Sequence, residues 1–356
     1  MTAAMALDLS MDPALLTAAL CDIESVSGNE AALADAIEVA LRPLPHLRVE
    51  RDGNAVFART TAGRAERVVV AGHIDTVPVG DNLPTRVEGG RLYGCGTTDM
   101  KSGVAVALRL AASVPDPVRD VTWAFYDCEE VEADRNGLGR VARTNPGWLE
   151  ADFAVLMEPT NATVEGGCQG SLRADVTVRG HRAHPARSWH GTNAIHAAGA
   201  VLDRLRAYQA AEVEIDGLVY REGLNAVGIT GGVAGNVIPD ECTVSVNYRF
   251  APNKSEDEAA DVVRALFEGF DVSLSDSSPG ALPGLTHPAA AAFVAAIGKE
   301  PQPKFGWTDV ARFSALGVPA VNYGPGDPNV AHTREEYVEV ALIGECEARM
   351  RSWLTT

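Results

Sequence analysis

The sequence predicts an α/β fold in which a mostly parallel sheet is flanked by helices, with a second α+β domain inserted into it. Apolar, β-branched runs alternate with helix-like segments along much of the chain, which indicates crossover connections between parallel strands. The pattern changes between about residues 173 and 283, where strands and helices form a unit of their own. The length of 356 residues also exceeds one average domain of about 150 residues.

The expected strands of the main sheet are short apolar runs such as RVVVA and VTWAFY. The helices beside them are rich in alanine and leucine, with the spacing of packed helices. We expect strands at 67–71, 121–126, 153–157 and 318–323, and helices at 30–41 and 103–114.

The inserted unit is bounded by glycine- and proline-rich junctions, GGCQGS before it and SSPGALPG after it. The expected domains are therefore a discontinuous one, 1–172 with 284–356, and an inserted one, 173–283. Within the insertion we expect strands at 174–180, 224–230, 243–250 and 271–275, and helices at 193–209 and 256–267.

The composition is that of an ordinary globular protein, with 46% hydrophobic and 22% charged residues. A formal charge of −18 argues against nucleic acid or an anionic membrane as a partner, because both demand a basic face. The start, MTAAMALDLSMDPALL, lacks the pattern of a signal peptide, and no apolar stretch approaches the length of a membrane span. We expect a cytoplasmic protein.

Six cysteines are scattered along the chain without a C-x-x-C pair, which favours reduced thiols over disulfides. The alternative is metal ligation by Cys95 or Cys128, which lie near acidic motifs. Lone thiols are more often core residues.

Polar residues follow the expected strands where ligands bind in open α/β sheets, at the carboxyl edge. A single histidine there is usually structural, and an adjacent glutamate pair is usually a solvated loop. Here five separate positions meet the same requirement, and imidazole with carboxylate ligands suits zinc. The candidates are His73 and Asp75 after the first strand, Glu129 and Glu130 after the second, Glu158 after the third, His332 after the fourth, and Asp99 in a glycine-rich loop.

These residues lie in motifs that resemble the M20 metallopeptidase family in their usual order: HIDTVP at 73–78, GCGTTDMKSG at 94–103, YDCEE ending at Glu130, MEPT around Glu158, and the late His332. The resemblance covers nearly the whole chain. It implies a zinc-peptidase-like catalytic domain, with the insertion acting as a lid and dimerisation domain of a homodimer.

The resemblance also implies two zinc ions per subunit, for which Co²⁺ can substitute. Asp99 would bridge them, His73 and Glu158 would complete one site, and Glu130 and His332 the other. Asp75 would orient His73. Glu129 would act as the general base.

In the family, a histidine of the lid stabilises the oxyanion, often from the partner subunit. The segment here is Gly180-His181-Arg182-Ala183-His184. We expect His184 in this role, and His181 remains the alternative. His190 and His196 are interpreted as loop and helix residues.

The lid segment GGVAGNVIPDECTVSVNYRFAP is similar to the desuccinylase and acetylornithine deacetylase branch of the family. The implied substrate contacts are Asn236 and Arg249, with Arg312 and Gly324 as further candidates. An arginine fork is a natural carboxylate partner. The chain departs from an arginine-rich turn of some desuccinylases, having Cys168 and Gln169 there, so Arg173 is a candidate replacement.

The resemblance thus implies a metal-dependent amide hydrolase that converts N-succinyl-L,L-diaminopimelate to succinate and L,L-diaminopimelate, in lysine and peptidoglycan precursor synthesis. Its substrate is a small anionic acyl-amino acid. The alternatives are another enzyme of the family, such as an acetylornithine deacetylase, aminoacylase or dipeptidase, or a non-catalytic binding protein on the same scaffold. A nucleotide-binding protein is disfavoured, because GCG and GGVAG complete no phosphate-binding motif.

Overall fold

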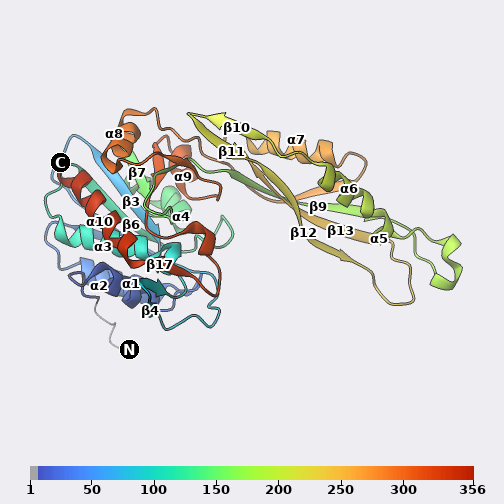
Figure 1. Ribbon diagram of the computed structural model, residues 1–356, viewed down its shortest axis with the longest axis horizontal. Helices are drawn as coiled ribbons and strands as arrows, with labels where there is room; N and C mark the ends of the chain where they lie inside the picture. The colour runs from blue at the N-terminus through green and yellow to red at the C-terminus, as the bar shows by residue number, and fades with distance from the viewer. Residues whose placement is uncertain (1–6) are drawn as a thin grey trace. The chain divides into compact units, whose positions relative to one another are not determined.

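The computed structural model describes residues 7–356 and divides them into two compact units (Figure 1). The first unit runs to Gly166 and continues through Pro283–Gln302 and Arg312–Thr356. The second comprises Gly167–Leu282 and Pro303–Ala311. Residues 303–311 thus group with the second unit, while the lid function expected for 173–283 stays a prediction. The first six residues, which entered the signal-peptide interpretation, lie outside the described part.

The first unit is built on an eight-stranded mixed sheet of order β1-β2-β6-β3-β7-β16-β8-β15. The four strands expected from the apolar runs lie next to one another at its centre and run parallel. Every residue of β6 is buried, which explains the continuous apolar run. The four strands are β3 (Arg67–His73), β6 (Asp120–Tyr126), β7 (Phe153–Leu156) and β16 (Ala320–Asn322).

Antiparallel strands extend the parallel core, so the expectation of a mostly parallel sheet is confirmed and refined. A hairpin of two strands pairs with β6 on one side, and short strands complete the other edge. A separate three-stranded sheet has the order β17-β5-β4. These strands are β1 (Arg48–Asp52), β2 (Ala55–Arg59), β8 (Glu165–Gly166), β15 (Gln302–Pro303), β4 (Arg86–Glu88), β5 (Arg91–Tyr93) and β17 (Tyr337–Glu339).

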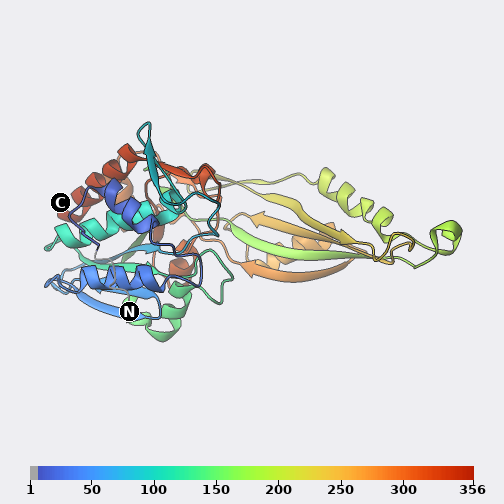
Figure 2. The same ribbon diagram turned by 90° about the horizontal axis from the view of Figure 1, so that it is seen from below.

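Helices cover the sheet of the first unit (Figure 2). Alternate strand residues, such as Val68 and Val70 of β3, pack with the helices in one large apolar core. Trp148 packs against Phe57 of β2, with ring centroids 5.1 Å apart and the ring planes tilted by 48°. The helices are α1 (Pro13–Cys21), α2 (Ala31–Leu41), α3 (Ser102–Ser113), α4 (Gly137–Thr144), α8 (Pro288–Ile297) and α10 (Val340–Thr355). A further helix, α9 (Val310–Ala315), begins with two residues grouped with the second unit and continues in the first.

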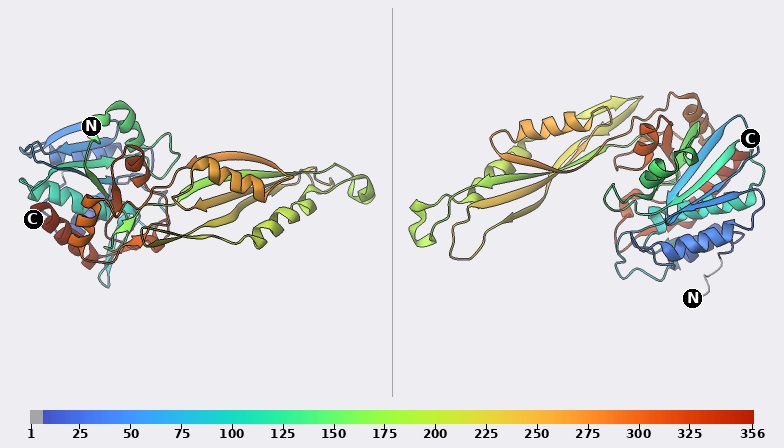
Figure 3. Two further views of the ribbon diagram at one scale, coloured as in Figure 1. Left: turned by 90° about the horizontal axis from the view of Figure 1, so that it is seen from above. Right: turned by 180° about the vertical axis from the view of Figure 1, so that it is seen from behind.

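The second unit is an antiparallel sheet of order β12-β13-β9-β14 with helices packed on one face (Figure 3). A separate two-stranded sheet joins β10 (Glu212–Ile215) to β11 (Leu218–Arg221). The helix expected at 193–209 is interrupted at Ala198, beside Gly199, a residue that favours helices poorly. The other elements are β9 (Gly170–Arg179), β12 (Gly223–Gly231), β13 (Glu241–Phe250), β14 (Asp271–Ser278), α5 (Ala194–Ala197), α6 (Gly199–Ala207) and α7 (Glu256–Leu266).

Two further expectations can be compared with the structure. All six cysteines are free and buried, as predicted for reduced thiols. Between residues 7 and 356, no helix combines the length and the apolar character needed to cross a bilayer.

Candidate metal centre

The carboxyl ends of the parallel strands deliver the predicted ligands to one edge of the first unit. His73 is the last residue of β3, the acidic pair Glu129–Glu130 follows β6, and Glu158 follows β7. His73 is 1% exposed and Glu158 is 4% exposed, so both lie beneath the surface. The strand-end rule therefore predicted their location correctly.

Asp99 lies between the two histidines. Its Oδ1 atom is 3.1 Å from Nε2 of His73, and its Oδ2 atom is 3.4 Å from Nε2 of His332. The residue sits in an irregular turn, Thr97–Lys101, where its φ and ψ of −119° and 97° leave the helical region. One carboxylate thus faces both imidazoles with different oxygen atoms.

Two overlapping groups of possible ligands share Asp99. In each group the donor atoms lie within 4.8 Å of one another. A third group, His73 with Glu129 and Glu130, lies alongside. Of the two groups that share Asp99, one consists of His73, Asp99 and Glu158, and the other of Asp99, Glu130 and His332.

The electrostatics of this edge suit a divalent cation. Burial raises the pKa of Glu130, and the nearby charge of Asp99 raises it further, against the opposing hydrogen bond from His332. The pKa of Asp99 is held well below its usual range, because hydrogen bonds from His332 and His73 outweigh its burial. Crowded, partly buried carboxylates beside imidazoles are a donor set that zinc prefers. The residues present therefore fit metal ions.

Asp75 supports both the histidine and the acidic pair. The Nδ1 atom of His73 lies 3.1 Å from the backbone oxygen of Asp75 and 3.4 Å from its carboxylate. The two carboxylate oxygens accept the backbone N–H groups of Glu129 and Glu130 at 3.0 and 3.1 Å, and Ser27 donates its hydroxyl at 2.7 Å. The sequence predicted the first contact. It gave no sign of the others.

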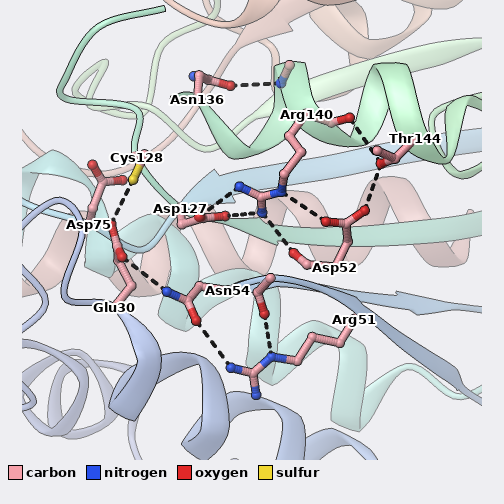
Figure 4. A network of polar contacts seen from close by, with 12 residues as sticks. Glu30, Arg51, Asp52, Asn54, Asp75, Asp127, Cys128, Asn136, Arg140 and Thr144 are labelled. Atoms are coloured by element: carbon pink, nitrogen blue, oxygen red, sulfur yellow. Dashed lines mark hydrogen bonds and ion pairs between the residues drawn. The ribbon is translucent and has the colours of Figure 1, made fainter. Parts of the chain in front are cut away.

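The loop before the acidic pair is anchored by a buried polar network (Figure 4). The Cys128 thiol donates to Oε1 of Glu30 at 3.3 Å, and its backbone adopts a positive φ of 58°. Next to it, Arg140 binds Asp127 with both terminal nitrogens, at 2.7 and 3.1 Å, and also binds Asp52. Cys128 therefore lies in a cluster with Glu30 and Asp127. The carboxylate of Asp127 is already paired with the guanidinium of Arg140.

Glu336 is a buried residue of the centre that sequence reasoning missed. Its Oε1 atom accepts the backbone N–H groups of Thr98 and Asp99 at 2.9 and 3.1 Å. Burial raises its pKa to about 7, against the backbone hydrogen bonds that lower it. Glu336 lies four residues after His332, in the segment HTREE, and this position was the only hint in the sequence. The sequence does not reveal that its carboxylate accepts the backbone N–H groups of Thr98 and Asp99.

Two glycines pack against the carbonyl of Met157, directly before Glu158. A Cβ atom at Gly103 would lie 2.1 Å from the Met157 oxygen, and one at Gly324 would lie 2.3 Å from it. Neither position can accept a side chain without displacing the chain that carries Glu158. Gly324, expected as a substrate contact, thus has a packing role in this structure.

The remaining predicted residues are distributed over both units. Arg312 belongs to the first unit, where its Nη2 atom donates to the backbone oxygen of Ala133 at 3.2 Å. Asn236, Arg249, His181 and His184 belong to the second. Asn236 is exposed in a turn, both histidines are exposed, and Nδ1 of His184 accepts the backbone N–H of Ala186 at 3.1 Å.

A largely parallel sheet whose strand ends gather two donor groups around one shared carboxylate defines the class of metal-dependent hydrolases. The chain belongs to peptidase family M20/M25/M40, whose model matches residues 69–356. The family resemblance seen in the sequence is therefore confirmed, and the protein is a metal-dependent hydrolase of this family.

Two of its relatives are similar over nearly their whole length, and a third over most of it. The chain is 56% identical over 351 residues to a Mycobacterium tuberculosis protein provisionally named succinyl-diaminopimelate desuccinylase DapE, covering 98% of this chain and 99% of that one. It is 50% identical to the succinyl-diaminopimelate desuccinylase of Corynebacterium glutamicum, covering 98% of both. An acetylornithine deacetylase of Myxococcus xanthus is 30% identical, over 83% of this chain and 80% of the relative.

Solved structures confirm the fold. A tripeptidase from Staphylococcus aureus superposes with a TM-score of 0.77 at 18% identity, covering 98% of both chains. A metallo-carboxypeptidase of the M20 family from Sulfolobus solfataricus gives 0.76 at 14% identity, over 97% of this chain and 99% of that one.

Proposed function

We propose that the protein is a succinyl-diaminopimelate desuccinylase, which hydrolyses N-succinyl-L,L-diaminopimelate to succinate and L,L-diaminopimelate. The observation that carries this proposal is the 50–56% identity, over 98% of the chain, to desuccinylases of two actinobacteria. The geometry supports the same reaction class, because the donor groups around Asp99 suit amide hydrolysis. The reaction belongs to the synthesis of diaminopimelate and lysine, and a cytoplasmic location stays a prediction.

Two zinc ions, with Co²⁺ as a substitute, are the proposed cofactors. Two ions a few ångströms apart polarise the amide carbonyl and make a water molecule more acidic. Asp99 offers a different oxygen to each donor group, as a bridging ligand requires. His73 and Glu158 would hold one ion, and Glu130 and His332 the other.

Glu129 is the proposed general base. It lies in the donor group with His73 and Glu130, and its backbone is fixed by Asp75. Its carboxylate would take a proton from the attacking water as the oxygen bonds to the acyl carbon. It would then give that proton to the amine nitrogen as the C–N bond breaks. Glu129 is not a member of the two ligand groups that share Asp99, so we assign it to proton transfer and not to metal binding.

The second unit is proposed to supply the oxyanion histidine and substrate contacts. His184 keeps the assignment from the family spacing, and the residue is exposed. His181 is the alternative and is exposed as well. Asn236 and Arg249 are the proposed substrate contacts there, and Arg312 is a further candidate in the first unit.

A homodimer through the second unit is supported by the edge strand β12. No other strand of the described sheet pairs with its outer side. Val227 and Ile229 on this strand are 66% and 53% exposed, and Val233 beyond it is 58% exposed. An open edge beside exposed apolar side chains is a site where a second chain can add.

The proposal is tested by comparing turnover by the zinc-loaded protein of N-succinyl-L,L-diaminopimelate, N-acetylornithine and simple dipeptides. We expect the highest kcat/KM for the succinylated substrate. A preference for acetylornithine or a dipeptide would reassign the chain to another activity of the family. No hydrolysis of any of them by metal-loaded protein would support a non-catalytic role.

A further inference from the structure

Lys101 is a buried lysine in the turn that carries Asp99. Only 1% of the residue is exposed, and its Nζ atom donates to the backbone oxygens of Leu20 and Ile23 at 3.1 and 3.0 Å. Among residues 7–356, no carboxylate forms an ion pair with it. Lysine is rarely buried without an anionic partner, because removing its charge from water costs free energy. The contacts of this lysine must therefore offset that cost.

The two acceptors of the ammonium lie at the end of α1. Leu20 belongs to the last turn of this helix, where backbone carbonyls have no donor within the helix, and Ile23 follows two residues after its end. The C-terminal end of a helix also carries a partial negative charge, which favours a cation there. Lys101 thus binds the end of α1 from a position 78 residues after Ile23.

The stem of the lysine lies inside its own turn. A Cβ atom built on Gly96 would lie 3.3 Å from Cδ of Lys101 and 3.5 Å from its Cε, so the stem passes over this glycine. The backbone N–H of Lys101 donates to the oxygen of Gly96 at 2.8 Å. Gly96 has a positive φ of 80°, which glycine adopts without strain. The hydrogen bond and the packed stem together close the turn around Asp99.

The residues on both sides of Asp99 are fixed to other segments. Before it, the hydroxyl of Thr98 donates to the backbone oxygen of Tyr337 in β17. After it, the Sδ atom of Met100 accepts the backbone N–H of His73 at 3.4 Å. The buried lysine adds a third attachment, to the end of α1. Three different segments thus determine where the shared carboxylate lies.

The turn depends on these attachments because its backbone is irregular. The φ and ψ angles of Asp99 and of Met100, −133° and 35° for the latter, leave the helical region. No regular hydrogen-bond ladder fixes such a segment. Yet the two carboxylate oxygens of Asp99 lie 3.1 Å from His73 and 3.4 Å from His332, so a small displacement of the turn would alter both distances.

We propose that Lys101 is a positioning residue for the metal centre, because its ammonium ties the turn to the end of α1 and thereby holds the carboxylate of Asp99 between the two donor groups. The inference rests on the proposed function, in which these groups bind metal ions. Both groups share Asp99, so the loss of Lys101 acts on both ions, whereas the loss of His332 acts on one.

The first test is the zinc affinity of the full chain, measured by competition with a chelator. Lys101→Met removes the ammonium and keeps most of the side-chain length. The dissociation constants of both zinc ions should rise by about 10–100-fold, as when outer partners of metal ligands are lost. Lys101→Gln retains an N–H donor on a shorter, uncharged side chain and should show a smaller rise.

Arg109→Met is the matched control. Arg109 of α3 also donates to a backbone oxygen, that of Met11 just before α1, and it pairs with Glu347 at 2.7 Å. Its loss should lower the free energy of unfolding but leave the zinc affinities at their wild-type values. Equal changes of zinc affinity in Arg109→Met and Lys101→Met would show that the lysine contributes to stability only, and the proposal would be wrong.

A second measurement needs neither metal nor substrate. Amide hydrogen exchange of the metal-free protein should be faster in residues 97–101 of Lys101→Met by about tenfold or more, and unchanged there in Arg109→Met. A wild-type exchange rate in Lys101→Met would overturn the proposal. If the wild type binds no zinc, the proposed function fails, and the exchange rates alone decide whether the lysine holds the turn.

Discussion

The Nε2 atom of His332 lies 2.8 Å from the Oε1 atom of Glu130, although 202 positions separate the two residues. His332 has a positive φ of 62°, a conformation that L-residues rarely adopt. The fold thus holds this imidazole against two carboxylates, those of Glu130 and Asp99. Backbone strain at a candidate ligand is typical of functional sites.

Replacing His332 should remove one metal ion. We expect two zinc ions per chain in the wild type and one in His332→Ala, because the other donor group keeps His73, Asp99 and Glu158. Metal analysis of purified protein measures this. His196→Ala, an exposed helix residue of the second unit, should keep both ions. Chelation should abolish hydrolysis, with Zn²⁺ or Co²⁺ restoring it; full metal content in His332→Ala would contradict the assignment.

Replacing Glu129 should stop proton transfer without loss of metal. In Glu129→Gln the amide keeps the shape but cannot accept the proton, so kcat should fall by about 10²–10⁴-fold. The zinc content should stay at the wild-type value. Glu132→Gln, an exposed neighbour, is the control and should retain activity. Wild-type kcat in Glu129→Gln would refute the mechanism.

The thiol of Cys128 should position the acidic pair. Cys128→Ala removes the donor to Glu30, and kcat should fall by about 10-fold or more, as when outer partners of metal ligands are lost. Cys128→Ser keeps a donor and should recover most of the activity. Cys242→Ala truncates a buried cysteine of the second unit and should behave like the wild type. Equal activity in the alanine and serine variants would assign the thiol a packing role only.

Protonation of the Asp120 carboxylate at low pH should lower the free energy of unfolding. Burial raises its pKa, but hydrogen bonds from Thr60 and from the backbone of Ala62 and Arg64 outweigh this and lower it. Because its pKa is lower in the folded than in the unfolded state, its contribution is present above the unfolded value of about 3.9 and is lost as the pH falls through the folded value.

The variant Asp120→Asn tests this. At pH 7 its free energy of unfolding should be lower than that of the wild type by about 1–3 kcal/mol, from unmatched buried donors. Denaturant unfolding at a series of pH values should show the difference shrinking below about pH 4. Asp116→Asn, whose side chain is 79% exposed, should cost little at any pH. A difference that is constant down to pH 2 would show that charge is not involved.

The edge strand β12 should mediate dimerisation. Ile229→Lys places a charge on an exposed apolar position, and sedimentation should show a shift from dimer to monomer. Val87→Lys, on the exposed strand β4 of the first unit, is the matched control and should leave the dimer intact. A wild-type protein that sediments as a monomer would rule out the dimer.

Much of the centre could be predicted from the sequence because of where its residues lie. His73, Glu130 and Glu158 follow strands that are recognisable as continuous apolar runs, and the direction of parallel strands sends their carboxyl ends to one edge. The antiparallel hairpin β1–β2 escaped prediction, because half-exposed residues such as those of β1 have no marked periodicity.

The supporting residues were beyond sequence reasoning. Glu336 holds the backbone of Asp99 and Glu30 holds Cys128, and neither carboxylate differs by local pattern from the many exposed ones. Gly103 and Gly324 come from distant segments to meet the same Met157 carbonyl. Such contacts depend on how segments pack, and no short window of residues contains them.

The sequence by itself determined the order of strands and helices and the residue types that arrive at the sheet edge, because periodicity and propensity are properties of neighbouring residues. Only the tertiary structure decided that Asp99 faces both His73 and His332 with different oxygens, and that Arg249 pairs in register with Ser171 of β9 and Gly223 of β12. Those relations are distances between chain segments, which are set by packing and strand register.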